Sequence, residues 1–202
     1  MSEQLFYNTI EKPSLAEFKD RGSRFLAYAF PIQSAEDFKK NQQQLKKEHP
    51  KAAHHCFAYR LGLDGNAFRV SDDGEPSGTA GKPILGQLDS KGITNVLVIV
   101  VRYFGGTLLG VPGLINAYKS AAAMALQLTP IVQKQVLTSY NLSFDYTMMN
   151  DVMMIVKQFA CEVKSQQTLL FCEMLVAIPK GRLNEVLFKF KELRSVEVMP
   201  VK

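Results

Sequence analysis

The chain lacks the features by which several classes of protein are identified from sequence. It has only three cysteines in 202 residues, and Cys56, Cys161 and Cys172 form no C-x-x-C pair. Three thiols cannot all pair within one chain, so the cysteines indicate a reducing compartment, and we expect a cytoplasmic protein. The N-terminal residues MSEQLFYNTIEK show no basic stretch followed by an apolar one, and the longest apolar runs are too short to span a bilayer. The sequence therefore predicts a soluble protein rather than a secreted disulfide scaffold or a membrane protein.

Neither sign of charge dominates the chain. Lysine and arginine together number 24 against 19 aspartates and glutamates, which gives a net charge of +5. Such a mild excess permits an anionic partner but does not require one. Hydrophobic residues make up 47% of the sequence, which at this length supports one large core or two small ones. We predict two domains.

Two glycine-rich segments lack the residues that would make them nucleotide-binding loops. In GTAGKP, residues 78–83, Pro83 stands where a phosphate-binding loop carries the Ser or Thr that reaches the magnesium ion. In GGTLLG, residues 105–110, the G-x-G opening of a dinucleotide-binding turn is missing. The sequence predicts no nucleotide cofactor.

The alternation of apolar and polar residues predicts the elements of a first domain, residues 1–130. Strands are expected over residues 15–20, 24–31, 53–61, 67–71 and 95–103, and helices from Ser34 towards Pro50, within residues 78–91 and over residues 112–128. Gly62, Asp64 and Gly65 predict a turn between the third and fourth strands. Pro83 is expected to move the regular part of its helix further along the chain.

The segment LTPIVQKQ, residues 128–135, predicts a short linker because Pro130 ends the preceding helix. Beyond it, residues 137–202 predict the order β-α-β-β-α-β, which is that of a ferredoxin-like domain. The strands are expected over residues 137–146, 160–165, 168–178 and 195–201, and the helices over residues 149–159 and 179–193. Pro179 is placed at the start of the second helix, where proline is favoured.

The run VVRYFGGTLLG, residues 100–110, places a charged side chain at the end of a buried strand. Residues 96–101 are continuously apolar and largely β-branched, as in a central strand covered on both faces. Arg102 follows where that strand leaves the core, and Gly105 and Gly106 allow a sharp turn or a close backbone approach. Because an emerging guanidinium benefits from a bidentate partner, we expect Arg102 to pair with a carboxylate of residues 72–75.

The loop SDDGEPSGTAGK, residues 71–82, supplies three carboxylates, Asp72, Asp73 and Glu75. Carboxylates this close could share a proton, bind a hard cation, or orient arginine and lysine side chains. Alternatively, the segment is an Asp-Asp-Gly turn whose side chains accept hydrogen bonds from backbone N–H groups.

The strand HHCFAYR, residues 54–60, carries His54, Cys56 and Arg60 on one face and His55 on the other, because side chains alternate along a strand. His54 and Cys56 could begin a zinc site, but no third or fourth ligand has suitable spacing, so no metal site is predicted. A histidine that activates the thiol is also possible in principle, although side chains two residues apart in a strand stand too far apart for direct contact. The remaining interpretation is a core-lining strand whose histidines form local hydrogen bonds.

These three motifs, which follow one another along the chain as HHCFAYR, SDDGEPSGTAGK and VVRYFGGTLLG over about residues 20–127, resemble the IMPACT family, in particular its bacterial YigZ-type branch. The resemblance implies an α+β fold, in which a first domain like domain 2 of ribosomal protein S5 and the fourth domain of the translocation elongation factor precedes a second domain like that factor's fifth domain. It also implies a shared functional surface. That surface comprises His54, Arg60, Asp72, Asp73, Glu75, Lys82, Arg102, Tyr103, Gly105, Gly106 and Lys119.

Three functions are compatible with these observations. The first is a non-enzymatic protein that binds RNA or the ribosome and acts in translation or its regulation; it requires a positive stripe formed by Arg102, Lys119, Lys82, Lys180 and Arg182. The second is a small-molecule hydrolase that uses His54, Asp72, Asp73 and Glu75, which requires converging carboxylates in a deep pocket. The third is a regulator that binds protein without nucleic acid. Eukaryotic relatives regulate translation through a scaffold protein, but the domain that binds this partner is absent here, so that role is not transferred.

Overall fold

The computed structural model describes residues 4–63, 67–168 and 171–201. The chain divides into two compact units: Tyr7–Lys134 forms one, and Gln135–Lys202 together with Met1–Phe6 forms the other. Both units combine helices with largely antiparallel sheet, which confirms the expected α+β class. No helix in the described part of the chain is long and apolar enough to cross a membrane.

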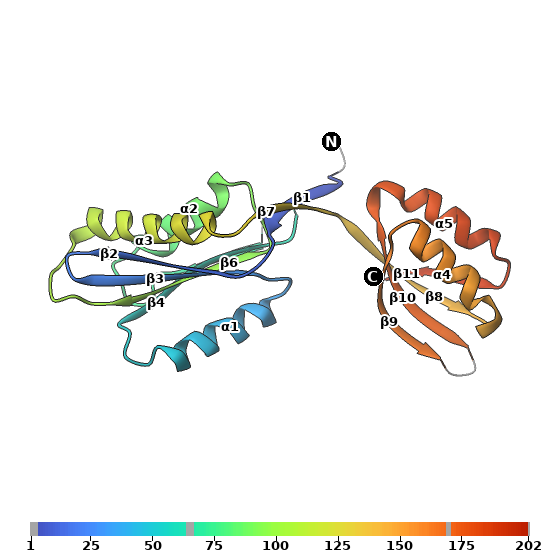
Figure 1. Ribbon diagram of the computed structural model, residues 1–202, viewed down its shortest axis with the longest axis horizontal. Helices are drawn as coiled ribbons and strands as arrows, with labels where there is room; N and C mark the ends of the chain where they lie inside the picture. The colour runs from blue at the N-terminus through green and yellow to red at the C-terminus, as the bar shows by residue number, and fades with distance from the viewer. Residues whose placement is uncertain (1–3, 64–66, 169–170, 202) are drawn as a thin grey trace. The chain divides into compact units, whose positions relative to one another are not determined.

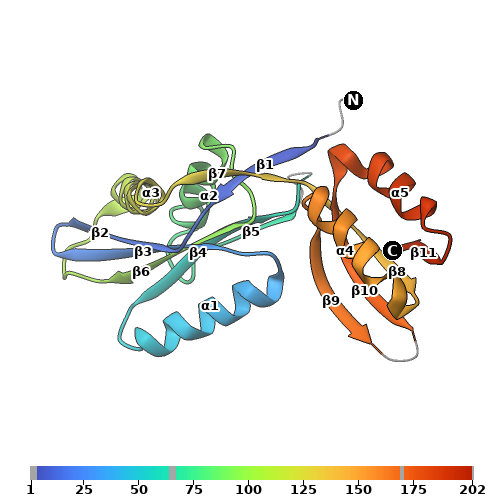
Figure 2. The same ribbon diagram turned by 45° about the vertical axis from the view of Figure 1, so that its right-hand side comes forward.

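The first unit is built on a five-stranded sheet. The strand order is β2 (Ser14–Asp20), β3 (Ser23–Pro31), β6 (Val96–Tyr103), β4 (His54–Leu61) and β5 (Ala67–Ser71), and all neighbours are antiparallel. Helices α2 (Gly81–Ser90) and α3 (Gly110–Gln127) lie on one face and α1 (Ala35–Glu48) on the other, as Figures 1 and 2 show. The sheet is therefore the middle of three layers.

The central strand β6 shows why its sequence is continuously apolar. Val98 and Val100 pack into the core beneath α2 and α3, whereas Ile99 and Val101 pack into the core beneath α1. Both faces of the strand are covered, as the sequence predicts. On α3 the buried face is rich in alanine, whose small side chain lets the helix backbone lie close to the sheet.

Helix α1 begins where its sequence predicts. The Ser34 hydroxyl accepts a hydrogen bond from the Asp37 N–H, and the Asp37 carboxylate accepts one from the Ser34 N–H, so the two residues form a capping box. This exchange satisfies backbone donors that have no partner within the helix.

Two helix starts differ from the predicted ones. Helix α2 begins at Gly81, so Pro83 lies in its first turn instead of delaying the helix; the proline is tolerated there because N–H groups of a first turn have no partner within the helix. Helix α3 begins at Gly110 rather than at residue 112. Of the predicted turn between β4 and β5, Asp64 and Gly65 lie outside the described residues.

The second unit follows the predicted element order. The elements are β8 (Leu137–Phe144), a short 3₁₀ turn η1 (Tyr146–Met148), α4 (Met149–Gln158), β9 (Glu162–Thr168), β10 (Cys172–Pro179), a second 3₁₀ turn η2 (Lys180–Arg182), α5 (Leu183–Glu192) and β11 (Val196–Pro200). The strands are arranged β11-β8-β10-β9, and α4 and α5 cover one face of this sheet (Figure 1). Pro179 ends β10 and is the N-cap of η2, so a helical turn starts there as predicted, but α5 itself begins only at Leu183.

The expected linker contains a strand. Strand β7 (Ile131–Gln135) pairs with β1 (Phe6–Ile10), an N-terminal strand that the sequence pattern does not reveal. Four of the five residues of β7 are exposed. Because β7 has no buried face, its sequence shows no alternation of apolar and polar residues, and the pattern therefore predicts a linker.

Candidate functional site

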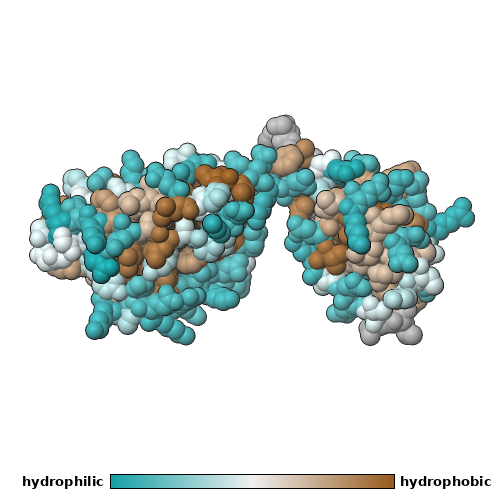
Figure 3. Space-filling model, viewed as in Figure 1, coloured by the Kyte–Doolittle hydropathy of each residue, from teal (hydrophilic) through white to brown (hydrophobic). Residues whose placement is uncertain are grey.

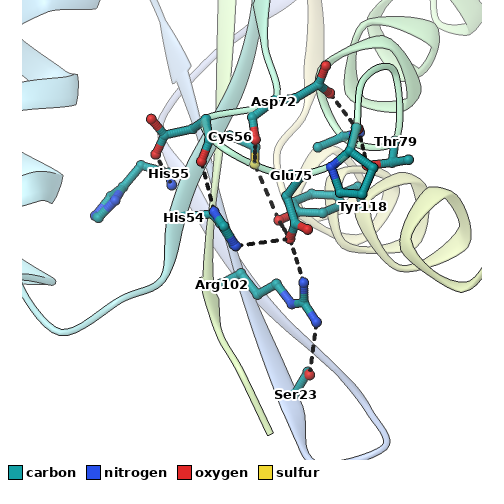
Figure 4. A network of polar contacts seen from close by, with 12 residues as sticks. Ser23, His54, His55, Cys56, Asp72, Glu75, Thr79, Arg102 and Tyr118 are labelled. Carbon is teal, nitrogen blue, oxygen red and sulfur yellow. Dashed lines mark hydrogen bonds and ion pairs between the residues drawn. The ribbon is translucent and has the colours of Figure 1, made fainter. Parts of the chain in front are cut away.

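The charged end of β6 meets the acidic loop in the interior of the first unit. In the sheet, Arg102 lies between Phe25 of β3 and His54 of β4. Its Nη1 donates a hydrogen bond of 2.6 Å to Oε1 of Glu75 (Figure 4), which confirms the predicted pairing with a carboxylate. The two side chains are 6% and 4% exposed, so this ion pair is buried.

Glu75 is the centre of the network. Oε1 accepts a second hydrogen bond, of 2.7 Å, from the Tyr118 hydroxyl of α3, and Nε2 of His54 lies 3.8 Å away. A buried carboxylate is costly unless its charge is compensated and its oxygens are hydrogen-bonded. Arg102 supplies the opposite charge, Tyr118 donates a hydrogen bond, and the His54 ring lies beside them. Three different elements thus meet at Glu75, and the acidic loop is fixed on the sheet.

The Asp72 side chain forms hydrogen bonds with the backbone of its own loop. Its carboxylate accepts hydrogen bonds of 2.8 to 3.0 Å from the N–H groups of Gly78, Ala80 and Gly81, and thereby caps the start of α2. Burial alone would raise the pKa of Asp72, but these three hydrogen bonds and the charge of Lys82 outweigh it and lower the pKa. This carboxylate is therefore ionised and fully engaged.

Asp73 has a similar role in the turn. Its carboxylate accepts a 2.6 Å hydrogen bond from the His55 N–H, and its carbonyl oxygen lies 2.8 Å from Nδ1 of His54. Asp73 and Gly74 have φ values of 42° and 90°, and the Glu75 N–H donates to the Asp72 carbonyl. The Asp-Asp-Gly turn interpretation is confirmed for both aspartates.

The lowered pKa of Asp72 predicts a pH dependence of stability. Because the folded-state pKa lies below the unfolded value, the carboxylate stabilises the fold above about pH 4 and loses this effect as the pH falls through the folded pKa. The stability difference between the unaltered chain and Asp72→Asn should be largest at neutral pH and shrink in acid, as measured by urea denaturation. Asp151→Asn in α4 is the control for loss of a carboxylate. A difference that stays constant below pH 4 would refute the assigned role.

Three further titratable groups at this end of the sheet are neutral at pH 7. Burial raises the pKa of the Cys56 thiol and of the Tyr118 hydroxyl, and it lowers the pKa of His55. The Cys56 sulfur lies 3.0 Å from the Asp72 carbonyl oxygen and 3.3 Å from the Tyr118 hydroxyl. A reactive thiolate is therefore not supported. Among the described residues, no group of three or more His, Cys, Asp or Glu side chains could hold a metal ion.

Ser23 connects the network to the glycine turn. Its hydroxyl lies 3.4 Å from Nη2 of Arg102 and accepts a 3.2 Å hydrogen bond from the Gly105 N–H. Gly105 lies so close to Gly22 that a Cβ at Gly105 would overlap the backbone of Gly22 and Ser23. Sequence reasoning identified the glycines of this turn but gave no signal for Ser23 or Tyr118, whose roles depend on tertiary contacts alone.

Two residues of the expected shared surface lie elsewhere. Arg60 is at the opposite end of β4 and pairs with Asp89 of α2 at 2.6 Å. Tyr103 lies on the α1 face of the sheet, where its hydroxyl is 2.8 Å from Nδ1 of His49, and the Tyr28 hydroxyl is 2.7 Å from the other ring nitrogen. Neither residue joins the Glu75 network.

Of the expected basic residues, Lys82 and Lys119 are exposed on α2 and α3. Lys180 and Arg182 belong to the second unit, where Arg182 forms hydrogen bonds of 3.1 and 3.2 Å with Glu185 and lies over the Phe159 ring. Arg102 is 5% exposed. Its burial against Glu75 corrects the expectation that it would form part of a positive stripe.

The hydrolase alternative requires carboxylates that converge in a pocket, and the acidic loop arranges its carboxylates differently. The carboxylates of Asp72, Asp73 and Glu75 have separate partners, namely the start of α2, the backbone of β4 and the Arg102 guanidinium. They do not converge on a common point where a substrate or a shared proton would lie. The arrangement fixes two loops to the sheet.

On both sides of the glycine turn, the chain exposes hydrophobic side chains. Phe104, Leu108, Val111 and Ile115 are 51%, 82%, 51% and 38% exposed, and we call residues 104–115 the apolar segment. Phe104 also lies over the guanidinium of Arg102. Figure 3, seen from the same side as Figure 1, shows hydrophobic residues among hydrophilic ones on the surface of the first unit. Lys119 is the single charged residue of α3.

Comparison with known proteins gave matches over the first unit and over the whole chain. The sequence pattern described as the Impact N-terminal domain matches residues 21–126. The "IMPACT family member YigZ" of Escherichia coli (strain K12) is 35% identical over 169 residues, which cover 83% of this chain and 81% of that protein. An "IMPACT family member" of Haemophilus influenzae is 38% identical and covers 71% of both chains. A crystal structure of a hypothetical protein with 30% identity covers 99% of both chains with a TM-score of 0.79.

Proposed function

Because the chain belongs to the IMPACT family, we propose that it is a non-enzymatic protein of the translation apparatus that binds the ribosome through the apolar segment. One observation carries this proposal: apart from Lys82, the charged residues of the three motifs form contacts within the fold, whereas the segment that they hold in place is exposed and hydrophobic. Exposed apolar patches on a soluble unit mark surfaces that bind macromolecules.

The position of the network supports this interpretation. Arg102 contacts Ser23, and Ser23 in turn accepts the N–H of Gly105, so the buried ion pair is linked directly to the first residues of the apolar segment. Phe104 lies 5.6 Å from the Arg102 guanidinium carbon. A surface held by such contacts loses little conformational entropy when it binds a partner, whereas a mobile loop would have to become ordered.

The fold expected from sequence supports a ribosomal partner. The sequence resemblance implies a first unit like domain 2 of ribosomal protein S5 and the fourth domain of the translocation elongation factor. The β-α-β-β-α-β order of the second unit is compatible with the ferredoxin-like domain that the resemblance implies after it. Fold likeness alone does not establish function. In this proposal the expected fold likeness is the reason for choosing the ribosome among the macromolecules that the apolar segment could bind.

Lys82 and Lys119 are the two basic residues of the first unit that we assign to this surface. Both are exposed, and Lys119 follows Ile115 by one turn of α3. Two phosphate contacts would give the affinity a weak salt dependence, with a slope of about −2 in a double logarithmic plot. A protein that binds only through the RNA backbone would show a much steeper slope.

Sedimentation of the full chain with purified bacterial ribosomes tests the proposal. We expect the chain to pellet with intact ribosomes at low and moderate salt, and to bind deproteinised ribosomal RNA more weakly. Absence of binding at low salt would refute the proposal. Equal binding to naked RNA with a steep salt dependence would also refute it and indicate a phosphate-tracking protein.

A further inference from the structure

The sheet of the second unit has one open face. Helices α4 and α5 pack on the side formed by Leu142, Phe144, Met174 and Val176. The alternate residues of the same strands point to the other side, which no helix of this unit covers. This open face contains two adjoining hollows of about 180 Å³ and 310 Å³, which share Ser143.

The strand register places two acidic residues in one row across this face. Glu197 of β11 is opposite Ser143 of β8, Ser143 is opposite Glu173 of β10, and Glu173 is opposite Gln167 of β9. Since neighbouring strands lie about 4.8 Å apart, the two glutamates are about 10 Å apart across the sheet. Asp145 lines the second hollow beside Glu197.

These carboxylates are not neutralised by the rest of the unit. Within the described residues, Glu173 and Glu197 form no ion pair, and no lysine or arginine lines either hollow. The basic residues Lys180, Arg182, Lys189 and Lys191 belong to η2 and α5. Lys164 of β9 pairs with Glu162. The two hollows of the open face are therefore lined by Glu173, Glu197 and Asp145 and by no basic residue.

Hydrophobic side chains adjoin the acidic row. The next row across the sheet contains Met199, Asn141, Leu175 and Ser165. Met199 is 53% exposed, and Phe171, which lines the second hollow, is 63% exposed. The open face thus offers carboxylates and apolar contacts side by side, together with amide and hydroxyl groups that can hydrogen-bond to a backbone.

We propose that the open face of this sheet binds a basic, extended segment of another protein. Lysine or arginine side chains of the segment would pair with Glu173 and Glu197, and its aliphatic side chains would lie on Met199 and Leu175. The charge complementarity selects this partner, because phosphates of a nucleic acid would be repelled by the same carboxylates. This site is separate from the apolar segment of the first unit, and its test does not depend on the proposed function.

Binding of a synthetic peptide to the full chain tests this inference. The probe is a fluorescein-labelled peptide of repeating Lys-Leu-Lys-Ser, and the reference peptide has glutamate in place of lysine; fluorescence anisotropy gives both affinities. We expect the lysine peptide to bind and the glutamate peptide not to bind. The double variant Glu173→Gln/Glu197→Gln should weaken binding of the lysine peptide about five- to tenfold.

The matched control removes the same charge from α5. In Glu185→Gln/Glu192→Gln the net charge changes equally, but the carboxylates lie on the helix side of the unit, so the affinity should stay close to that of the unaltered chain. Equal weakening by both double variants would show a nonspecific charge effect and overturn the proposal. Preferential binding of a single-stranded RNA of similar length, displaced by neither peptide, would overturn it as well.

Discussion

Replacement of Arg102 by alanine lowers the free energy of unfolding by about 3–5 kcal/mol, the range observed when one partner of a buried ion pair is removed. The loss is large because Glu75 remains in place with a side chain that is 4% exposed. Its negative charge then has no guanidinium partner, and Ser23 loses a contact with Arg102. Urea denaturation of the full chain measures the change, with the transition of the first unit followed separately where the two units unfold independently.

The same substitution at the other end of the sheet provides the control. Arg60 also pairs with a carboxylate, but that of Asp89 is 47% exposed, and exposed ion pairs contribute about 0–1 kcal/mol. Arg60→Ala should therefore have a much smaller effect than Arg102→Ala. Comparable losses at the two positions would contradict the assignment of Arg102 to a buried network.

Replacement of Gly105 by alanine is expected to cost about 2–3 kcal/mol, because overpacking forces the neighbouring backbone to shift. The new Cβ would overlap the Gly22 carbonyl carbon and the Ser23 nitrogen. Both atoms belong to the tight turn between β2 and β3, in which Gly22 has a φ of 79°. The turn cannot move away without breaking the hydrogen bond between Gly105 and Ser23.

Gly86 offers a matched control for this substitution. It lies within α2, and a Cβ built there meets nothing within 4 Å. Gly86→Ala should raise stability by about 0.5–1 kcal/mol, because alanine is favoured over glycine in a helix. Thermal unfolding of both variants compares them directly. Equal stability of the two variants would show that Gly105 does not lie against the β2–β3 turn.

Much of the first unit follows from local patterns in the sequence. The apolar run of β6 predicts a strand covered on both faces, and Ser34 with Asp37 predicts the start of α1. The pairing of Arg102 with a carboxylate also follows, because a charge at the end of a buried strand requires a counterion. The sequence does not say which of three neighbouring carboxylates supplies it.

The remaining features depend on contacts between distant segments. Tyr118 lies among alanines on α3 and has the sequence context of an ordinary core residue, and only the fold brings its hydroxyl to Glu75. The burial of Arg102 depends on the loop that carries Glu75, which is 27 residues away in sequence. Strands β1 and β7 pair with each other, and most residues of β7 are exposed, so no burial pattern distinguishes them from loops.

Ribosome binding by Leu108→Gln tests the central claim most directly. Leu108 is 82% exposed in the apolar segment, and Leu128, which is 61% exposed at the far end of α3, provides the same substitution outside it. Sedimentation with purified ribosomes should show binding by the unaltered chain and by Leu128→Gln, and binding weakened about tenfold in Leu108→Gln, as expected for loss of an apolar anchor worth about 1.4 kcal/mol. All three proteins should unfold at similar temperatures. Equal binding by all three, or binding by none, would contradict the account.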